Sequence, residues 1–339
     1  MIRVAAIVVV SQAPQGFAGV LNHAESLQGE PLQTPLPLLE LMGSSPLQRT
    51  VSRLQQSGVE AIHVISTNQQ WAGLSTGNRL SVETTSETEE AWVLATCTAR
   101  EVANTGFDLV LVIRMGPYVE FSLDRLVENH RDRAKGITRL YDQAGPVDIW
   151  LIDAERIRKN LHLTSARELL SERPSRYGAC SYVNRLDSVL DLRRLALDIL
   201  LMRCATRPGG TQIKPGIWIE ADANVDKSVR LVGPSYVGRG ARIRRSVLLT
   251  RFSHVESHCE IDFGTALEDS SILSNTYIGP SLDVTHAVVS GSHITHLQRN
   301  VALQVLDPLL VSKTSTVALQ PLKHRATAAQ WMGRFIQTS

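Results

Sequence analysis

Two histidines that stand four residues apart are the first side chains here whose chemistry suits a catalyst. His254 and His258 lie within residues 252–259, and an imidazole can act as a general base toward a hydroxyl or an amine. In a fold of short strands and corners this spacing puts the two rings on neighbouring faces. The alternative is that both are solvent-facing turn residues, so they are weak catalytic candidates.

The cysteines indicate neither a metal centre nor a disulfide framework. Cys97, Cys180, Cys204 and Cys259 are scattered without CxxC spacing, which favours a reduced, cytoplasmic protein. His286, His293 and His296 follow the most regular part of the sequence, and we expect them to face water or a partner subunit. No set of metal ligands is predicted.

Composition and charge exclude two classes of partner. The 339 residues include 35 Lys+Arg and 33 Asp+Glu, a formal net charge of +2, which provides no global field for nucleic acid. The longest apolar run, Val4–Val10, is far shorter than the ~20 residues that span a bilayer. We therefore expect no nucleic-acid binding and no membrane span.

The first half has the pattern of an α/β domain. Val4–Val10 is a continuous aliphatic run, as in a central parallel strand buried on both faces. Residues 11–37 are rich in Gly, Pro and Gln, which predicts a long loop. Ser45 and Pro46 then start a helix that Gly58 ends. Strands are predicted at 59–65, 107–113 and 148–152, and helices at 87–102, 123–130 and 186–202.

The second half carries a period of six. Aliphatic side chains recur at every sixth position, and mostly small or β-branched residues follow each of them by four. The aliphatic positions are Ile213, Ile219, Val225, Leu231, Val237, Ile243, Leu249, Val255, Ile261, Leu267 and Leu273. Neither a helix nor an ordinary strand has this period, but a triangular solenoid does. The register slips after Leu273, where Ile278 and Val284 come one residue early.

These patterns predict the fold class and the domains. We expect a Rossmann-like α/β domain of βαβ units over residues 1–204, followed by a left-handed parallel β-helix at 211–294. Residues 205–210, with the Arg-Pro-Gly-Gly run, form the predicted linker. A C-terminal extension at 295–339 contains a short amphipathic helix around 326–336.

A βαβ domain followed by a hexapeptide β-helix resembles the sugar-phosphate nucleotidyltransferases, also called nucleotide-sugar pyrophosphorylases. The resemblance covers about residues 3–294 and rests on the opening strand, on Pro-Leu-Pro-Leu-Leu at 35–39 and on the helix leading into 58–64. It implies that a nucleotide binds next to the loop after the first strand. Ser11, Gln12, Gly16 and Pro37 are thereby weak substrate-binding candidates.

Three functional groups of that family are missing. The family's loop ending in Gly-Thr-Arg-Leu holds phosphates, but residues 11–17 here read Ser-Gln-Ala-Pro-Gln-Gly-Phe. Leu36 replaces the family's phosphate-binding Lys. The family's Mg²⁺-holding Asp falls within residues 113–116, which read Ile-Arg-Met-Gly. Asp187 matches the family's second metal carboxylate and is a weak catalytic candidate.

The combined losses predict a catalytically degenerate member of the family. It would act as a binding, regulatory or assembly subunit in nucleotide-sugar or surface-polysaccharide metabolism. Two alternatives stay open: an active, Mg²⁺-dependent nucleotidyltransferase of the mannose-1-phosphate guanylyltransferase type, and a β-helix acyltransferase that uses His254 or His258. Expected partners are a nucleotide or nucleotide-sugar and, through the β-helix, further copies of the chain or a catalytic subunit. No other cofactor is predicted.

Overall fold

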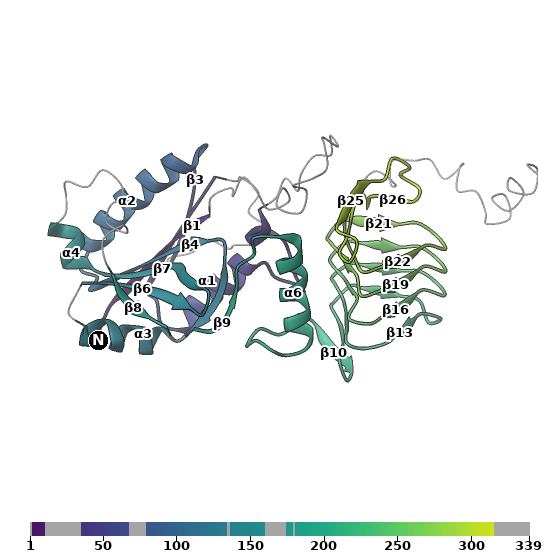
Figure 1. Cartoon of the computed structure of the whole chain (residues 1–339), viewed down its shortest axis with the longest axis horizontal. Coiled ribbons are helices and arrows are strands. Elements are labelled where there is room, and N and C mark those ends of the chain that lie inside the picture. The colour runs from purple at the N-terminus through teal and green to yellow at the C-terminus, as the bar shows by residue number, and fades with distance from the viewer. Residues whose placement is uncertain are drawn as a thin grey trace, which may run out of the picture. The chain divides into compact units, whose positions relative to one another are not determined.

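The computed structural model describes residues 2–10, 35–67, 79–133, 136–159, 174–178 and 180–314. The chain divides into two compact units, Met1–Ile219 and Glu220–Ser339. The first unit is a sheet with helices, and the second is a stack of short strands in successive coils (Figure 1). None of the helices among the described residues has the length and apolar character needed to cross a membrane.

The α/β unit is built on one seven-stranded sheet with the order β3-β2-β1-β4-β7-β6-β8, beside a two-stranded sheet β5-β9. Its strands are β1 (Val4–Val10), β2 (Ala61–Ser66), β3 (Leu80–Thr84), β4 (Leu109–Met115), β5 (Tyr118–Phe121), β6 (Ile137–Asp142), β7 (Gly145–Asp153), β8 (Ser175–Tyr177) and β9 (Cys180–Asn184). Its helices are η2 (Leu36–Leu38), α1 (Pro46–Gln56), α2 (Thr88–Asn104), α3 (Leu123–Asp132), α4 (Ala154–Lys159) and α6 (Val189–Leu200).

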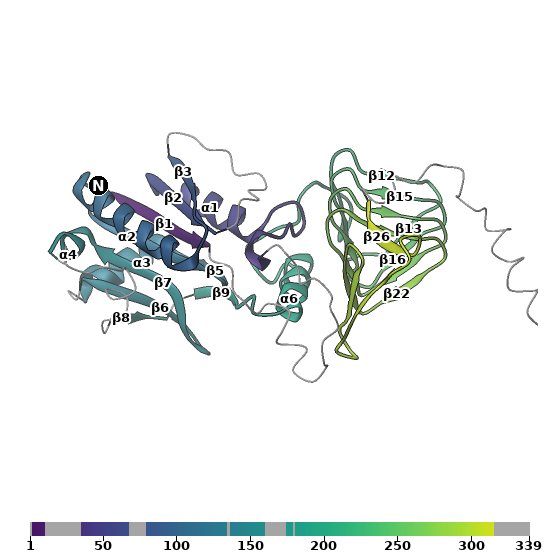
Figure 2. The same ribbon diagram turned by 90° about the horizontal axis from the view of Figure 1, so that it is seen from above.

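The predicted central strand is confirmed in β1. All seven of its residues are buried, and it pairs in parallel with β2 on one side and β4 on the other. Val4, Ala6 and Val8 belong to one hydrophobic cluster of the core, whereas the alternate side chains of β1 belong to a second cluster. Helix α2 packs along β1 and β2 (Figure 2). Both faces of the sheet are therefore covered.

Helix α1 begins where the sequence predicted. The Ser45 side chain accepts a hydrogen bond from the Gln48 amide at 3.2 Å, and the Gln48 side chain accepts one from the Ser45 amide at 2.7 Å. This reciprocal pair is a capping box. Pro46 opens the helix, and Gly58, at φ 83°, adopts the left-handed conformation just beyond its end.

Helix α6 forms within the predicted helix at 186–202. Leu190 is 48% exposed. Val189, Leu192, Leu195, Ala196 and Ile199 are buried. The helix carries apolar side chains on more than one face, so a period of 3.6 residues could not select the face that packs.

A parallel β-helix with three sheets forms the second unit, except that its first two strands, β10 and β11, precede Glu220. The orders of the three sheets are β10-β11-β14-β17-β20-β23-β24-β25, β12-β15-β18-β21-β26 and β13-β16-β19-β22. The strands are β10 (Thr211–Lys214), β11 (Ile217–Ile219), β12 (Asn224–Val225), β13 (Arg230–Leu231), β14 (Ser235–Val237), β15 (Arg242–Ile243), β16 (Leu248–Thr250), β17 (His254–Val255), β18 (Glu260–Ile261), β19 (Ala266–Glu268), β20 (Ser271–Ile272), β21 (Thr276–Ile278), β22 (Asp283–Thr285), β23 (Ala287–Ser290), β24 (His293–His296), β25 (Val301–Gln304) and β26 (Val311–Lys313).

Most of the small side chains that follow the aliphatic ones by four positions are buried, as predicted, whereas Ala223 and Val229 are half-buried. Ser235, Ala241, Val247, Ser253, Cys259 and Thr265 are all at most 1% exposed. The Thr265 hydroxyl donates to the Gly279 carbonyl at 2.7 Å, and the Ser253 hydroxyl donates to the Thr250 carbonyl at 2.6 Å. Nearby backbone carbonyls thus satisfy these two hydroxyls, whereas the buried Ser235 hydroxyl has no partner among the described residues.

Two of the predicted hexapeptide positions need correction. Ile213 is 51% exposed and lies in the antiparallel hairpin β10-β11, outside the parallel coils. The partner of Val255 in the next coil is Ile272, not Leu273. The register slips earlier than predicted because one corner shortens. Arg251 and Phe252 both have positive φ at that corner, whereas Asp269 alone does so one coil later.

Candidate functional site

The carboxyl ends of β1, β2 and β4 meet at one edge of the large sheet. β1 lies between two parallel neighbours, since Val10 pairs with Ser66 on one side and with Met115 on the other. In open α/β sheets this is a switch point, where ligands bind beyond the carboxyl ends of the strands. The candidate site is therefore the surface around the ends of β1 and β4.

Arg114 occupies this edge. It is the exposed residue of the otherwise buried strand β4, and Val9 of β1 is its partner in the ladder. Its Nη1 lies 3.2 Å from Oδ2 of Asp148, a residue of β7. The other carboxylate oxygen of Asp148 lies 2.8 Å from Nη2 of Arg139 in β6. One carboxylate thus links two guanidinium groups.

Arg139 is held rigidly in this arrangement. Its Nε donates to the Val147 carbonyl at 3.2 Å, and its guanidinium lies 4.8 Å from the centre of the Trp150 ring. Such stacking of a cation on an indole is favourable and fixes the plane of the guanidinium. Arg114 is the more accessible of the two, with a side chain 45% exposed against 23% for Arg139.

Asp187 lies near this group and is exposed. Partial burial and the charges of Asp191 and Asp148 raise the pKa of Asp187, against the opposing charge of Arg185. Asp191 itself is engaged at the start of α6, where it accepts bonds from the Asp187 amide at 3.1 Å and the Ser188 hydroxyl at 3.0 Å. Asp187 is thus a carboxylate crowded by like charges.

The site contains no set of metal ligands within the described part of the chain. No group of three or more His, Cys, Asp or Glu side chains there has an arrangement that could hold a metal ion. Asp148, a residue of β7, lies beside the end of β4, and each of its two carboxylate oxygens faces an arginine. The residues present therefore do not fit a Mg²⁺ ion bound by carboxylates.

The proposed substrate-binding residues are only partly described. Ser11, Gln12 and Gly16 lie outside the described residues, as does the predicted helix at 326–336. Pro37 is buried in η2 together with Leu36 and Leu38. The structure therefore does not bring Pro37 to a surface that faces the ends of β1 and β4.

The two histidine candidates are separated. His254 in β17 is fully buried, with its Nε2 3.6 Å from Oε1 of Glu256, which is also fully buried. His258 is exposed at the next corner with φ 56°. A Cβ added at Gly240 would lie 2.7 Å from Nδ1 of His258, so the ring rests against that glycine. The turn interpretation holds for His258 and is wrong for His254.

A buried carboxylate that the sequence did not reveal lies elsewhere in the α/β unit. Glu120 is 3% exposed, and its Oε1 lies 2.9 Å from Nη2 of Arg53. It also accepts bonds from the Ala205 amide at 2.8 Å and from the Tyr118 hydroxyl at 3.2 Å. Burial alone would raise the pKa of Glu120, but the Ala205 amide and the Arg53 charge lower it below its usual value.

These contacts give Glu120 a structural role and not a catalytic one, and we call Glu120 with its partners the clamp. Its partners come from α1, β5 and the segment that follows α6, and Thr206 donates to it from its amide at 3.3 Å. The residues are widely separated in sequence, so no motif spacing could have identified them. The clamp fastens the end of the α/β unit to its helices.

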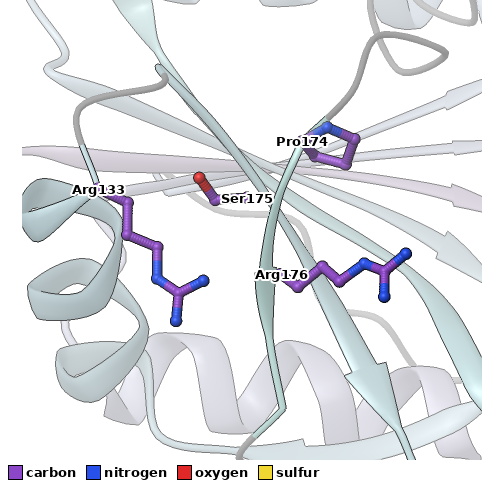
Figure 3. Close-up of a pocket in the computed structure, with 4 residues that line it drawn as sticks. All are labelled: Arg133, Pro174, Ser175 and Arg176. Atoms are coloured by element: carbon purple, nitrogen blue, oxygen red, sulfur yellow. The ribbon is translucent and has the colours of Figure 1, made fainter.

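Two further polar features were also missed. Nδ1 of His286 lies 2.7 Å from Oδ2 of Asp269 at a β-helix corner. A cavity of about 500 Å³ is lined by Arg133, Pro174, Ser175 and Arg176 (Figure 3). The buried Ser175 hydroxyl in it has no partner among the described residues, while the Arg176 guanidinium lies 5.1 Å from the Tyr141 ring. Arg176 pairs with Arg139 in the ladder between β8 and β6.

Comparisons with known proteins give partial similarities. No protein-family model matches the chain. A stretch of 103 residues is 26% identical to the bifunctional protein GlmU of Pelobacter propionicus, and it covers 30% of this chain but 22% of that relative. The match therefore spans about a fifth of the length of the curated relative.

Among solved structures, the chain is similar to a glucose-1-phosphate thymidylyltransferase, assigned as such, from Bacillus anthracis in complex with a sucrose. The identity is 14% and the TM-score 0.40, over 56% of this chain and 93% of that chain. The sequence similarity is thus to a protein of the class that the sequence analysis named, and it covers less than a third of this chain.

Proposed function

We propose that this protein is a nucleotidyltransferase-like subunit that does not transfer nucleotidyl groups. In this proposal it binds, regulates or assembles with a partner in cytoplasmic nucleotide-sugar or surface-polysaccharide metabolism. The observation that supports it most is the ion pair of Arg114 with Asp148 at the end of β4. Phosphoryl-type transfer depends on charge neutralisation by metal ions in fixed positions. A guanidinium group at this edge repels a divalent cation.

The β-helix supports the assembly part of the proposal. Strand β25 ends its sheet and exposes apolar side chains, with Val301 47% and Leu303 43% accessible. An open edge strand presents unpaired backbone groups that other chains can pair with. We therefore favour a partner, a second copy or a catalytic subunit, that attaches through this unit.

The acyltransferase alternative loses support from the position of His254. A general base must reach the hydroxyl or amine that it deprotonates, and His254 is fully buried. His258 is accessible, but no carboxylate that would orient its ring is seen among the described residues. We therefore do not favour this alternative.

A pyrophosphate-release assay tests the proposal. The full chain would be incubated with each nucleoside triphosphate, with mannose 1-phosphate or glucose 1-phosphate, and with Mg²⁺. We expect no release above the blank without protein. Asp187→Asn is the matched control, since Asp187 is the one residue here that matches a metal carboxylate of the family. Release that this variant abolishes would overturn the proposal, whereas release that it leaves unchanged comes from a contaminant.

A further inference from the structure

One row of aliphatic side chains runs along the inner face of the eight-stranded sheet, and each residue in it is the ladder partner of the next. The row consists of Val237, Val255, Ile272, Val289, Ile294 and Leu303. Its first four members are fully buried, whereas Leu303, in β25, is 43% exposed. Directly opposed residues of neighbouring strands share a face of the sheet, so Leu303 presents the interior face of the β-helix to solvent.

The exposure of Leu303 follows from where the sheets end. β22 is the last strand of its sheet among the described residues, whereas β24 and β25 extend the eight-stranded sheet beyond β23. The inner faces of β24 and β25 therefore project past the last complete coil. Val301, on the same face of β25 as Leu303, is 47% exposed, and Leu306, which follows the strand, is 87% exposed. We call Val301, Leu303 and Leu306 the end patch.

The described chain ends beside the end patch. β26 is its last strand, and just beyond it the Thr314 amide donates to the Asn275 carbonyl at 2.9 Å. A Cβ added at Gly291 would lie 3.0 Å from Cγ of Lys313, so the Lys313 side chain rests against the turn from β23 into β24. β25 pairs with β24, and neighbouring strands lie about 4.8 Å apart. The chain therefore leaves the described part of the structure within a few strand widths of the end patch (Figure 1).

The sequence that follows Thr314 suits this apolar surface. Residues 315–339 lie outside the described residues, and their sequence predicts an amphipathic helix at 326–336. Its apolar face consists of Ala329, Met332, Phe335 and Ile336. A helix of this length is marginal in water by itself, so its apolar face needs a surface to pack on. The linking residues 315–325 can span about 36 Å, which is more than a few strand widths.

We propose that the C-terminal segment packs back onto its own β-helix, with the apolar face of residues 326–336 on the end patch. The inference goes beyond the proposed function and does not rest on it. It assigns the inner face of β25 to the same chain and leaves the backbone edge of β25 to a partner. Both can be occupied together, because side chains stand perpendicular to a sheet while the free backbone groups of an edge strand lie in its plane.

Cross-linking in the full chain tests the inference. Val301→Cys is combined with Ala329→Cys, in a chain whose exposed native thiol is removed by Cys97→Ser, and the protein is treated with a short bismaleimide. A link within one chain leaves a monomer on a denaturing gel, whereas a link between chains gives a dimer. Mass spectrometry identifies the linked peptides. We expect a monomer that carries the link between positions 301 and 329 as the main product.

Val232→Cys with Ala329→Cys is the matched control. Val232 is 45% exposed, so its replacement offers a similarly accessible thiol, but it follows β13 at the other end of the stack (Figure 1). Packing on the end patch raises the effective concentration of the two thiols only in the first pair, so the control link should form about tenfold more slowly. Equal rates for the two pairs, or a dimer as the main product of the first pair, would overturn the inference.

Phe335→Asp, added to the first pair, tests the apolar contact. It should slow the link between Val301→Cys and Ala329→Cys about tenfold, since burial of an aromatic side chain is worth at least that factor in an equilibrium constant. Gln330→Asp introduces the same charge on the opposite face of the predicted helix and should leave the rate unchanged. Equal slowing by both changes, or no slowing by Phe335→Asp, would contradict packing through this face. Neither result bears on pyrophosphate release, so the proposed function is tested separately.

Discussion

The two units of this protein assemble their cores over very different sequence distances. In the α/β unit Val4 pairs with Leu109, so neighbouring central strands are far apart in the sequence. In the β-helix Val225 pairs with Ile243, the equivalent residue of the next coil. A fold made of local repeats shows a fixed period in its sequence. A sheet whose strands are distant in sequence shows only the apolar pattern of each single strand, and not which strands pair.

The units also differ in how they bury polar groups. The β-helix interior combines aliphatic side chains with small hydroxyls that bond to neighbouring carbonyls, as Thr265 does. The α/β unit instead encloses an ionised carboxylate, Glu120, with a guanidinium and several backbone donors. The stability of the β-helix should therefore depend most on the packing of its interior, and the stability of the α/β unit on the buried charge of Glu120.

The largest effect is expected from Ile243→Asp in the β-helix. Ile243 is 1% exposed and stacks between Val225 and Ile261. A carboxylate there would be buried without a partner, which should cost more than about 5 kcal/mol of unfolding free energy. Thiol labelling provides the measurement, because Cys259 is 1% exposed in this unit and Cys204 is 6% exposed in the other.

In Ile243→Asp we expect rapid labelling of Cys259 while Cys204 stays protected. Arg242→Ala, at the exposed neighbouring position, is the control and should leave both thiols protected. If both cysteines react together in Ile243→Asp, the two units unfold as one, and the contrast between them fails. Unchanged protection of Cys259 would show that the assigned register is wrong.

Glu120→Ala is expected to destabilise the α/β unit and to leave the β-helix intact. The change leaves Arg53 and the Ala205 amide without their carboxylate, and breaking a buried ion pair in this way costs about 3 to 5 kcal/mol. Cys204 should then react faster, and Cys259 should not. Glu60→Ala removes a carboxylate that is 38% exposed and should cost less than about 1 kcal/mol.

The same carboxylate predicts a pH dependence for the α/β unit alone. The pKa of Glu120 is lower in the folded chain than in the unfolded chain, so its contribution is complete above the unfolded value of about 4.3. The contribution is lost as the pH falls through the folded pKa. We expect Cys204 to lose protection below about pH 4 before Cys259 does, and Glu120→Gln to be less stable at neutral pH with a flatter acid profile.

The smallest predicted effect is a gain in stability from Asp187→Asn. Burial and the charges of Asp191 and Asp148 raise the pKa of Asp187, so its ionised form destabilises the folded unit at neutral pH. Because the side chain is exposed and screened, the gain should be about 0.5 kcal/mol or less. Urea unfolding at low salt measures it, and high salt should remove it. A loss of stability would show that Asp187 has a favourable partner.

Much of the fold was predictable from local signals. The aliphatic run of β1 identified the central strand, and Ser45, Pro46 and Gly58 marked both ends of the first helix. Strands β3, β5, β6, β8 and β9 were missed, because only their packing partners distinguish them from loops. The helix at 186–202 was predicted, but leucines lie on both its exposed and its buried side, so the sequence did not indicate which side packs.

For the candidate site, the sequence predicted mainly which functional groups of the family are missing. The sequence showed that no carboxylate stands at residues 113–116, but the role of Arg114 depends on Asp148 and Arg139, which approach it only when β4, β7 and β6 pair. The clamp around Glu120 depends in the same way on residues from three distant segments. Such contacts have no fixed spacing, so a single sequence does not contain them.

The shortened corner of the β-helix has a consequence for how this domain tolerates changes in length. Where one coil uses Arg251 and Phe252 to turn, the next uses Asp269 alone, yet Leu249 still pairs with Leu267, and Leu267 with Val284. A residue inserted or deleted at this corner changes the spacing between coils by one but leaves the same side chains facing the interior. This corner is therefore where a foreign loop or epitope could be grafted while the stacked interior keeps its phase.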